Sequence, residues 1–272
     1  MSHPPTLVCL HAHPDDEAML TGATLAKAAS LGLRTVVVYG TAGDAGEIRV
    51  DLGGEPLGER RAREATAACA ELGVARVEFL GYRDSGMAGT PTNDHPDAFC
   101  NAPTETALAR LVELVDGEVP FAVVGYDANG TYGHPDHLQV HRLAHALAAH
   151  LGAPWLLDAT YDREYLAGLP DSDGSLDPTF ASTRADLTHF VQGEPWFRAK
   201  MEAIKCHGSQ VSSDPKRPRR RIDGWRTRFG TEWFIARSGA GATDLGPLAA
   251  LFEPKASWPG PLSPPPRSEP HR

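Results

Sequence analysis

The chain has 272 residues, 41% of them hydrophobic, and a formal net charge of −9 at pH 7. This length allows a domain with a substantial core, and the acidic balance argues against a general binder of nucleic acid or anionic membranes. The sequence contains no apolar run that could span a bilayer, and its amino terminus, MSHPPTLVCL, lacks a signal-type pattern. We therefore expect a cytoplasmic protein without a membrane partner.

The chain alternates between strand and helix patterns. Strands are predicted, in chain order, at 6–10, 34–40, 75–80, 121–126, 155–161 and 232–236. Helices are predicted at 18–31, 57–72, 104–116, 138–151 and 195–207, with a basic irregular stretch before the last strand. This alternation predicts a Rossmann-like α/β fold, with a largely parallel, twisted sheet and helices on both faces. A single catalytic domain is expected over 1–253, and the proline-rich segment 254–272 is expected to be a disordered tail.

Two histidines and three acids follow the first predicted strand, in the stretch HAHPDDEAML at 11–20. Asp15 and Asp16 can cap a helix, and Glu17 suits its first turn. The cluster is thus expected where a strand hands over to a helix, which is where ligands bind in open α/β sheets. A dinucleotide site would need G-x-G-x-x-G at this turn, and carboxylates would repel its phosphates. The sequence therefore argues against a nucleotide-binding dehydrogenase.

A second cluster, YDANGTYGHPDHLQVHR at 126–142, follows a later predicted strand. His13 with Asp16 forms an H-x-x-D motif, and His134 with His137 forms an H-x-x-H motif. Each motif places two side chains of metal-ligand type about one helical turn apart. If the two strands that precede the clusters are neighbours in the sheet, both clusters meet in one crevice.

The residue types in these clusters suit a catalytic metal site. Neutral imidazoles with a carboxylate and no thiolate are typical of catalytic Zn²⁺, and Fe²⁺ accepts the same ligands. The four cysteines are scattered and form no C-x-x-C pair, so neither a disulfide framework nor a Cys-based zinc finger is predicted.

HPDDE after the first strand and HPDH after a later one resemble the motifs of the PIG-L/LmbE-like zinc N-deacetylases. These enzymes hydrolyse N-acetyl groups on amino sugars and related small molecules. The stretches 80–93 (LGYRDSGMAGTPTN) and 126–137 most resemble the mycothiol-pathway members, an N-acetylglucosaminyl-inositol deacetylase and a mycothiol-conjugate amidase. The similarity covers about 5–151 and resumes more weakly at 200–210, whereas the basic run DPKRPRRR at 214–221 departs from the pattern.

The resemblance implies a role for each residue of the two motifs. His13, Asp16 and His137 would be the zinc ligands. Asp15 would be the general base for the attacking water, and His134 the acid that protonates the leaving amine.

Supporting roles are expected around these residues. By its chemistry, Asp136 can hydrogen-bond an imidazole and fix its tautomer, and Tyr132 can donate a hydrogen bond to the developing oxyanion. The resemblance also implies that Glu47, Arg61 and Asp84 would line the sugar-binding side of the pocket, where charged groups can make several directed hydrogen bonds.

Structural roles stay open for four of these residues. Asp15 and Asp136 can simply cap helices, and Tyr132 can pack against its own loop. Arg61, in LGERRARE, can belong to a solvated face of ion pairs.

The sequence therefore predicts a metal-dependent hydrolase that removes an N-acetyl or other acyl group from an amino sugar or a related small molecule, such as an N-acetylglucosaminyl-inositol. The alternative is a zinc amidase that cleaves a mycothiol-type thiol conjugate. The basic run at 216–221 keeps open an electrostatic patch for an acidic partner or nucleic acid, although six residues in an acidic chain are weak support. The oligomeric state and the roles of His141, His207 and Gln210 stay open.

Overall fold

The computed structural model describes residues 5–169, 177, 179–211, 218–239, 242–253 and 257–258, the side chains of 218–223 excepted. The strands are β1 Thr6–His11, β2 Arg34–Thr41, β3 Arg76–Tyr82, β4 Pro120–Tyr126, β5 Trp155–Thr160, β6 His189–Gln192 and β7 Thr231–Ser238. The α-helices are α1 Asp16–Leu20, α2 Gly22–Ser30, α3 Leu57–Glu71, α4 Thr104–Leu114, α5 Gly130–Gly133, α6 Pro135–Leu151, α7 Arg163–Ala167, α8 Phe197–Cys206 and α9 Pro218–Phe229.

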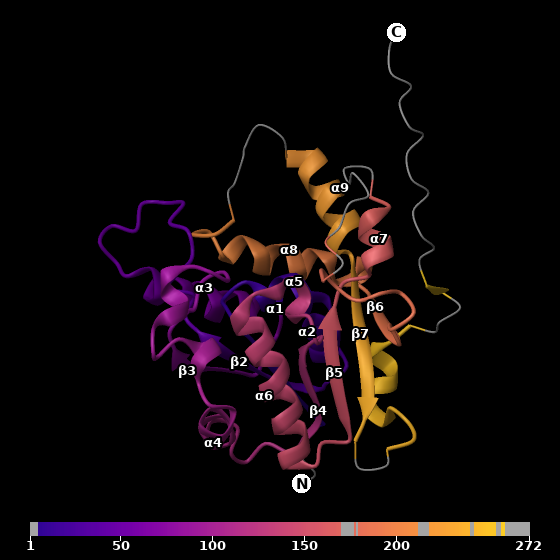
Figure 1. Ribbon diagram of the computed structural model, residues 1–272. Coiled ribbons are helices and arrows are strands. Elements are labelled where there is room, and N and C mark those ends of the chain that lie inside the picture. Colours follow the sequence, from indigo (N-terminus) through magenta and orange to yellow (C-terminus); the bar gives the residue numbers. More distant parts are fainter. Residues whose placement is uncertain are drawn as a thin grey trace.

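The described strands form one seven-stranded sheet in the order β3-β2-β1-β4-β5-β7-β6. Strands β1 to β5 pair in parallel, whereas β7 pairs antiparallel with β5 and β6 (Figure 1). The chain runs outward from β1 through β2 to β3, and then returns to place β4 on the other side of β1. This reversal is the switch point at which open α/β sheets form a crevice. The predicted fold is confirmed, with an antiparallel edge added by β7 and β6.

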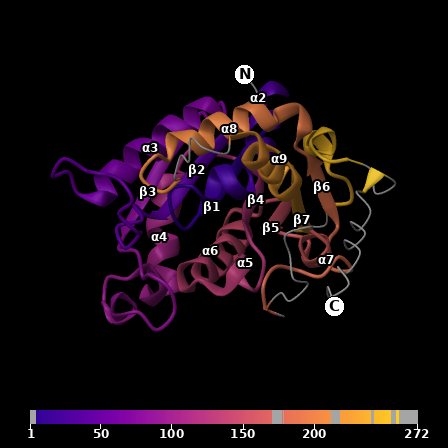
Figure 2. The ribbon, with the colours of Figure 1, turned by 90° about the horizontal axis from the view of Figure 1, so that it is seen from above.

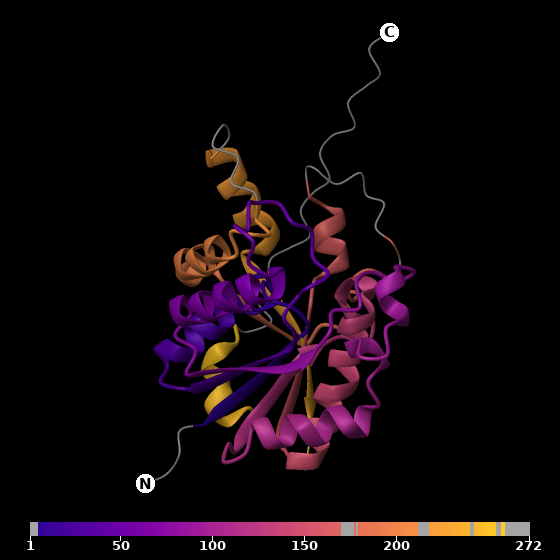
Figure 3. The same ribbon diagram turned by 90° about the vertical axis from the view of Figure 1, so that its left-hand side faces the viewer.

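Helices cover both faces of the sheet. Helices α2, α3 and α8 lie on one face, and α4 and α6 lie on the other (Figures 2 and 3). All six residues of β1 are buried, as expected of a central strand covered on both sides. Within the described ranges, no helix has both the length and the apolar character needed to cross a bilayer.

The helix predicted at 18–31 is two helices, α1 and α2, that are separated at Thr21. The Thr21 hydroxyl donates to the Glu17 carbonyl 3.0 Å away and lies 3.1 Å from Nε2 of His11. The first amides of α2 are capped by the carboxylate of Glu232, which lies on β7. Because this cap comes from a residue more than two hundred positions away, sequence patterns could not reveal the break.

Other differences from the prediction lie in short or basic segments. Strand β6 and helix α7 span four and five residues, too few for a clear periodicity. Helix α9 occupies part of the stretch that was expected to be irregular. The side chains of the basic run and the expected tail, apart from 257–258, lie outside the described residues. Both expectations therefore stay predictions.

A buried ion pair fastens α8 to the start of α2. Glu232 accepts hydrogen bonds from the amides of Ala23 and Thr24 and from the Thr24 hydroxyl, at 2.6–2.8 Å. Lys200 of α8 donates to the same carboxylate at 2.7 Å and to the Met19 carbonyl at 2.8 Å. Both charged side chains are 1% exposed. A buried charge is tolerated only when it is paired and hydrogen-bonded, and here both conditions are met.

Removing Lys200 should therefore destabilise the fold strongly. We expect Lys200→Met to lower the free energy of unfolding by about 3–5 kcal/mol, because Glu232 would keep a buried charge without its cation. Lys205→Met is the matched control, since Lys205 pairs with Glu202 on the exposed side of the same helix and should cost no more than about 1 kcal/mol. Denaturant unfolding measures both variants. Equal effects would show that the buried pair contributes no more than an exposed one.

Candidate active site and metal centre

The two charged clusters meet because their strands are neighbours. Strand β1 pairs in parallel with β4, so that Cys9 lies opposite Val124. The turn after β1 and the loop after β4 therefore leave the sheet side by side, at the switch point. His13 and Asp136, 123 residues apart in sequence, lie within hydrogen-bond distance of each other. The convergence expected from the sequence is confirmed.

Three side chains offer ligand atoms that face one another. Oδ2 of Asp16 lies 3.5 Å from Nδ1 of His13 and 3.3 Å from Nε2 of His137. One ligand atom of each residue lies within 4.8 Å of the others, and all three residues are buried. Two imidazoles and one carboxylate without a thiolate fit the donor set of a catalytic zinc site with an open position. These are the three residues that the family resemblance implied as ligands.

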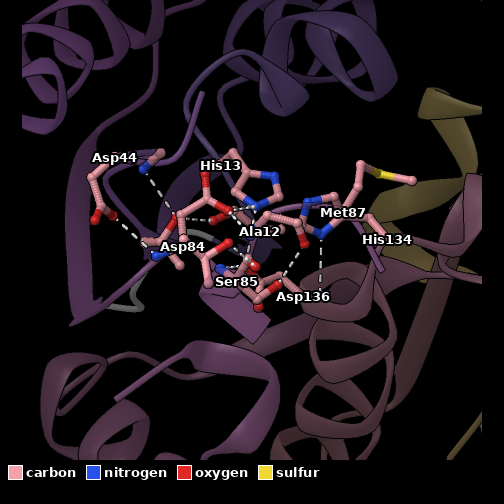
Figure 4. Close-up of polar contacts among 12 residues, drawn as sticks. Ala12, His13, Asp44, Asp84, Ser85, Met87, His134 and Asp136 are labelled. Atoms are coloured by element: carbon pink, nitrogen blue, oxygen red, sulfur yellow. Dashed lines mark hydrogen bonds and ion pairs between the residues drawn. The ribbon is translucent and has the colours of Figure 1, made fainter. Parts of the chain in front are cut away.

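The other ring nitrogen of His13, Nε2, faces two further carboxylates, those of Asp84 and Asp136 (Figure 4). Nε2 lies 3.2 Å from Oδ2 of Asp136 and 3.5 Å from Oδ1 of Asp84. Burial alone would lower the pKa of His13, but hydrogen bonds to Asp136, Asp16 and Asp84 raise it well above its usual value. A carboxylate on the far nitrogen is the arrangement that orients a histidine toward a metal.

Asp84 and Asp136 both contact His13, and both belong to a group of potential metal ligands that the sequence did not indicate. The Ser85 amide donates to Oδ2 of Asp136 at 2.9 Å, so the carboxylate does not cap its own helix. Oδ1 of Asp136 has no partner among the described residues. With His13 and His134, these two carboxylates form a second group of potential metal ligands. The side chain of Asp84 lies against His13 and is 5% exposed, and its expected place on the sugar-binding side stays a prediction.

Asp15 occupies a strained turn between the strand and α1. Its φ of 114° lies in the left-handed region, which non-glycine residues rarely adopt. It precedes α1 as the N-cap residue, but its side chain makes no capping hydrogen bond within the described structure. The carboxylate is thus left available, and it is 31% exposed. Burial raises the pKa of Asp15 to about 6, against the opposing charge of Arg61.

Arg61 is buried beneath this turn and does not lie on a solvated face. Its guanidinium donates to the carbonyls of Gly43 and Pro14 and lies 3.3 Å from Oδ2 of Asp15. The neighbouring arginines of α3 do form ion pairs at the surface, Arg63 with Glu55 for example. Glu47, by contrast, points outward and pairs with Arg49, with 77% of its side chain exposed. The expected role of Glu47 on the sugar-binding side stays a prediction.

His134 caps α6 and lies beside His13 and His137. Its Nδ1 accepts a hydrogen bond from the Asp136 amide at 3.2 Å, so the neutral ring carries its proton on Nε2. Its ring centroid lies 4.5 Å from that of His13. Burial and the adjacent histidines lower the pKa of His134 to about 4. His134 is therefore neutral near pH 7 in the free protein.

Tyr132 faces His137, one of the three candidate metal ligands. Its hydroxyl lies 3.1 Å from Nε2 of His137, and the side chain remains partly open to solvent. Burial raises the pKa of Tyr132, so the phenol keeps its proton and can donate. Asp127 holds the loop by accepting hydrogen bonds from the amides of Asn129 and Thr131 and from the Thr160 hydroxyl. Packing against its own loop is not the only contact that Tyr132 makes.

Glu17 and His207 form a buried pair that the sequence did not reveal. Nε2 of His207, at the end of α8, lies 2.6 Å from Oε1 of Glu17, and both side chains are fully buried. Oε2 of Glu17 accepts from the Asp15 amide at 3.0 Å and so supports the strained turn. The one sequence signal was the position of Glu17, in the first turn of a helix that begins directly after the first strand and its turn. His207 thus neither reaches an open pocket nor caps its helix with its side chain.

The sequence comparisons identify the family. The profile described as "PIG-L: GlcNAc-PI de-N-acetylase" matches residues 8–148. The chain belongs to the PIG-L family. A 1D-myo-inositol 2-acetamido-2-deoxy-alpha-D-glucopyranoside deacetylase of Acidothermus cellulolyticus is 36% identical over 263 residues, covering 86% of this chain and 89% of the relative. A protein of the same name from Nocardiopsis dassonvillei is 37% identical, covering 76% and 85%.

Solved structures share the fold of the chain. An N,N'-diacetylchitobiose deacetylase from Pyrococcus horikoshii superposes with a TM-score of 0.58 at 22% identity, covering 86% of this chain and 84% of that one. A 4-carboxy-2-hydroxymuconate hydratase from Pseudomonas putida superposes with a TM-score of 0.57 at 21% identity, covering 88% and 99%. A deacetylase and a hydratase therefore share this fold, so the fold alone does not decide the reaction.

The Glu17–His207 pair should contribute to the stability of the fold. Burial alone would lower the pKa of His207 and raise that of Glu17, but each charge reverses the trend for the other. We expect His207→Ala to lower the free energy of unfolding at pH 6 by about 3–5 kcal/mol, because the buried Glu17 loses its partner. His150→Ala, on the exposed end of α6, is the control and should change it by no more than about 0.5 kcal/mol.

The cost of His207→Ala should also depend on pH. Folding raises the pKa of His207, so its protonation contributes stability below an unfolded-state pKa of about 6.5, and this contribution is lost as the pH rises through the folded-state value. Urea unfolding at pH 6 and pH 9 measures the difference. A cost that is equal at both pH values would contradict the expected contribution of His207 protonation.

Proposed function

We propose that this chain is a metal-dependent N-deacetylase that removes an acetyl group from an amino sugar, with an N-acetylglucosaminyl-inositol as its substrate class. The observation that carries the proposal is the convergence of His13, Asp16 and His137 beside an Asp15 carboxylate that caps nothing. The names of the relatives from Acidothermus cellulolyticus and Nocardiopsis dassonvillei, which align over most of both chains, support the substrate class.

The proposed metal is Zn²⁺, with His13, Asp16 and His137 as its ligands; Fe²⁺ accepts the same atoms. When bound, the ion supplies a Lewis acid that polarises the amide carbonyl and lowers the pKa of water. Asp136 holds the His13 ring from its far nitrogen. With its Nδ1 toward Asp16, His13 then donates the Nε2 proton to Asp136.

Asp15 is the proposed general base for the attacking water. A pKa of about 6 leaves it ionised near neutral pH and close enough to that pH to accept a proton efficiently. Arg61 contacts the carboxylate and two carbonyls around it, so we propose a positioning role for Arg61 in addition to any contact with substrate.

His134 and Tyr132 are the proposed donors for the rest of the reaction. Because His134 is neutral in the free protein, the proton that it gives to the leaving amine must reach it during turnover. The reaction itself supplies a proton for His134, namely the one that Asp15 removes from water. Tyr132 keeps its phenolic proton and donates to the oxyanion that forms when water attacks the carbonyl.

An amine-release assay tests the proposed substrate class. The substrates are N-acetylglucosaminyl-inositol, N-acetylglucosamine and a mycothiol-type cysteinyl conjugate, each with and without a chelator. We expect turnover that depends on the metal and is highest with N-acetylglucosaminyl-inositol. Preference for the conjugate would identify the chain as the amidase that the sequence left as an alternative. Absence of metal-dependent turnover with all three would refute the deacetylase proposal.

Asp15 and Asp16 are adjacent acids, but substituting each of them should impair the enzyme in a different way. Asp16→Ala should lose most bound zinc, because two remaining ligands hold the ion poorly. Asp15→Asn should keep the zinc but lose about 10²–10⁴-fold in kcat, with little change in KM. Metal analysis and steady-state kinetics separate the two outcomes.

The pH profile adds a further check on Asp15. In the unsubstituted enzyme kcat/KM should rise with pH through about 6, because the base acts only when it is ionised. Asp15→Asn should lack this limb. If Asp15→Asn lost its zinc, or kept the acidic limb, Asp15 would not be the general base.

A further inference from the structure

Helix α6 carries a second pair of histidines beyond the active site. His141 and His145 lie one helical turn apart, and their ring centroids are 4.2 Å from each other. Together with Asp158 of β5 they form a group whose ligand atoms all lie within 4.8 Å of one another. None of the three belongs to either group around His13. We propose that these residues bind a divalent transition-metal ion at a second site, which is independent of the proposed function.

Hydrogen bonds already orient the ligand atoms. Nδ1 of His141 lies 2.8 Å from the carbonyl oxygen of Tyr126. Because a carbonyl only accepts, Nδ1 carries the proton and Nε2 keeps the lone pair that a metal needs. Histidines that bind metals commonly donate their other ring N–H to a carbonyl in this way. His141 is thus held in the tautomer of a ligand.

His145 and Asp158 supply the other two ligand atoms. Nε2 of His145 lies 3.0 Å from Oδ1 of Asp158. Two ligands of a tetrahedral zinc ion, each at about 2.0–2.1 Å, lie roughly 3.3 Å apart. The pair therefore needs little movement, provided that the His145 proton moves to Nδ1.

The carboxylate is fixed on the side away from the histidines. Asp158 is fully buried, and its Oδ2 accepts from Nε of Arg237 at 2.8 Å. The arginine occupies one oxygen and leaves the other toward His145, as hydrogen bonds to metal-binding carboxylates often do. Its positive charge opposes the ion, but half of the Arg237 side chain is exposed, so solvent screens that repulsion.

The ligand types select the kind of ion. Two imidazoles and one carboxylate suit Zn²⁺, Ni²⁺ or Cu²⁺, whereas Ca²⁺ and Mg²⁺ prefer sets of oxygen ligands. About a third of the His145 side chain is exposed, so an ion can arrive from solvent and water can complete its coordination. The bound ion would connect α6, whose first turn carries His137, to the neighbouring strand β5. Its expected effect is to stabilise the folded protein in proportion to its binding.

Equilibrium dialysis of tag-free protein against Zn²⁺ tests the site. The unsubstituted chain should bind two ions, and Asp16→Ala should lose the active-site ion but keep the second. In the Asp16→Ala background, His145→Gln and His141→Gln should each lower the affinity for the remaining ion by at least roughly 10-fold. His150→Gln, an exposed histidine on the same helix, is the matched control and should leave the affinity unchanged.

Thermal unfolding gives a second readout. Zn²⁺ should raise the Tm of Asp16→Ala, and this rise should disappear when either His145→Gln or His141→Gln is added. Turnover of singly substituted His145→Gln with its active site loaded should match the unsubstituted enzyme. Binding of a single ion by the unsubstituted chain, or a second ion that survives both histidine substitutions, would overturn the proposal. Because the second ion is followed in a variant without the active-site metal, the result does not depend on the deacetylase assay.

Discussion

The parallel pairing of β1 with β4 is the contact on which the active site depends. It places the turn after β1 beside the loop after β4, and no ligand group around His13 is complete without residues from both. The crossover through β2, α3, β3 and α4 returns the chain to the opposite side of β1. Because strand ends in a parallel sheet meet at one edge, this single pairing converts two distant motifs into one cluster.

Buried charges connect the carboxyl-terminal part of the chain to that cluster. Helix α8 contributes Lys200 to the Glu232 pair and leads directly into His207, which contacts Glu17. Glu17 in turn holds the amide of Asp15 in its left-handed turn. The family match ends at residue 148, so residues outside the matched region support the geometry of the HPDDE turn. Such pairs require both partners, since a buried charge left alone is costly.

The position of a side chain in the cluster around His13 decides its chemistry more than its residue type does. Asp15 and Asp16 are adjacent, but burial raises the pKa of Asp15, whereas His137 and His13 lower that of Asp16 despite its burial. One carboxylate is thereby suited to accept a proton and the other to remain ionised. A hydratase and a deacetylase share this fold, so the sheet alone does not decide the reaction.

The sequence by itself determined the alternating α/β order and the position of the two motifs at strand ends, because apolar runs, glycines and H-x-x-D or H-x-x-H spacings are local patterns. The family resemblance added His13, Asp16 and His137 as candidate metal ligands, and the structure brings them together. Only the tertiary structure decided which side chains are paired in the interior. Arg61 looks like its neighbours in ERRARE, but it is buried under Asp15. The break at Thr21 depends on Glu232, and the support of Asp15 depends on His207. The contacts of Glu232 and His207 join residues about two hundred positions apart. A local pattern cannot encode which distant residue will complete a hydrogen bond.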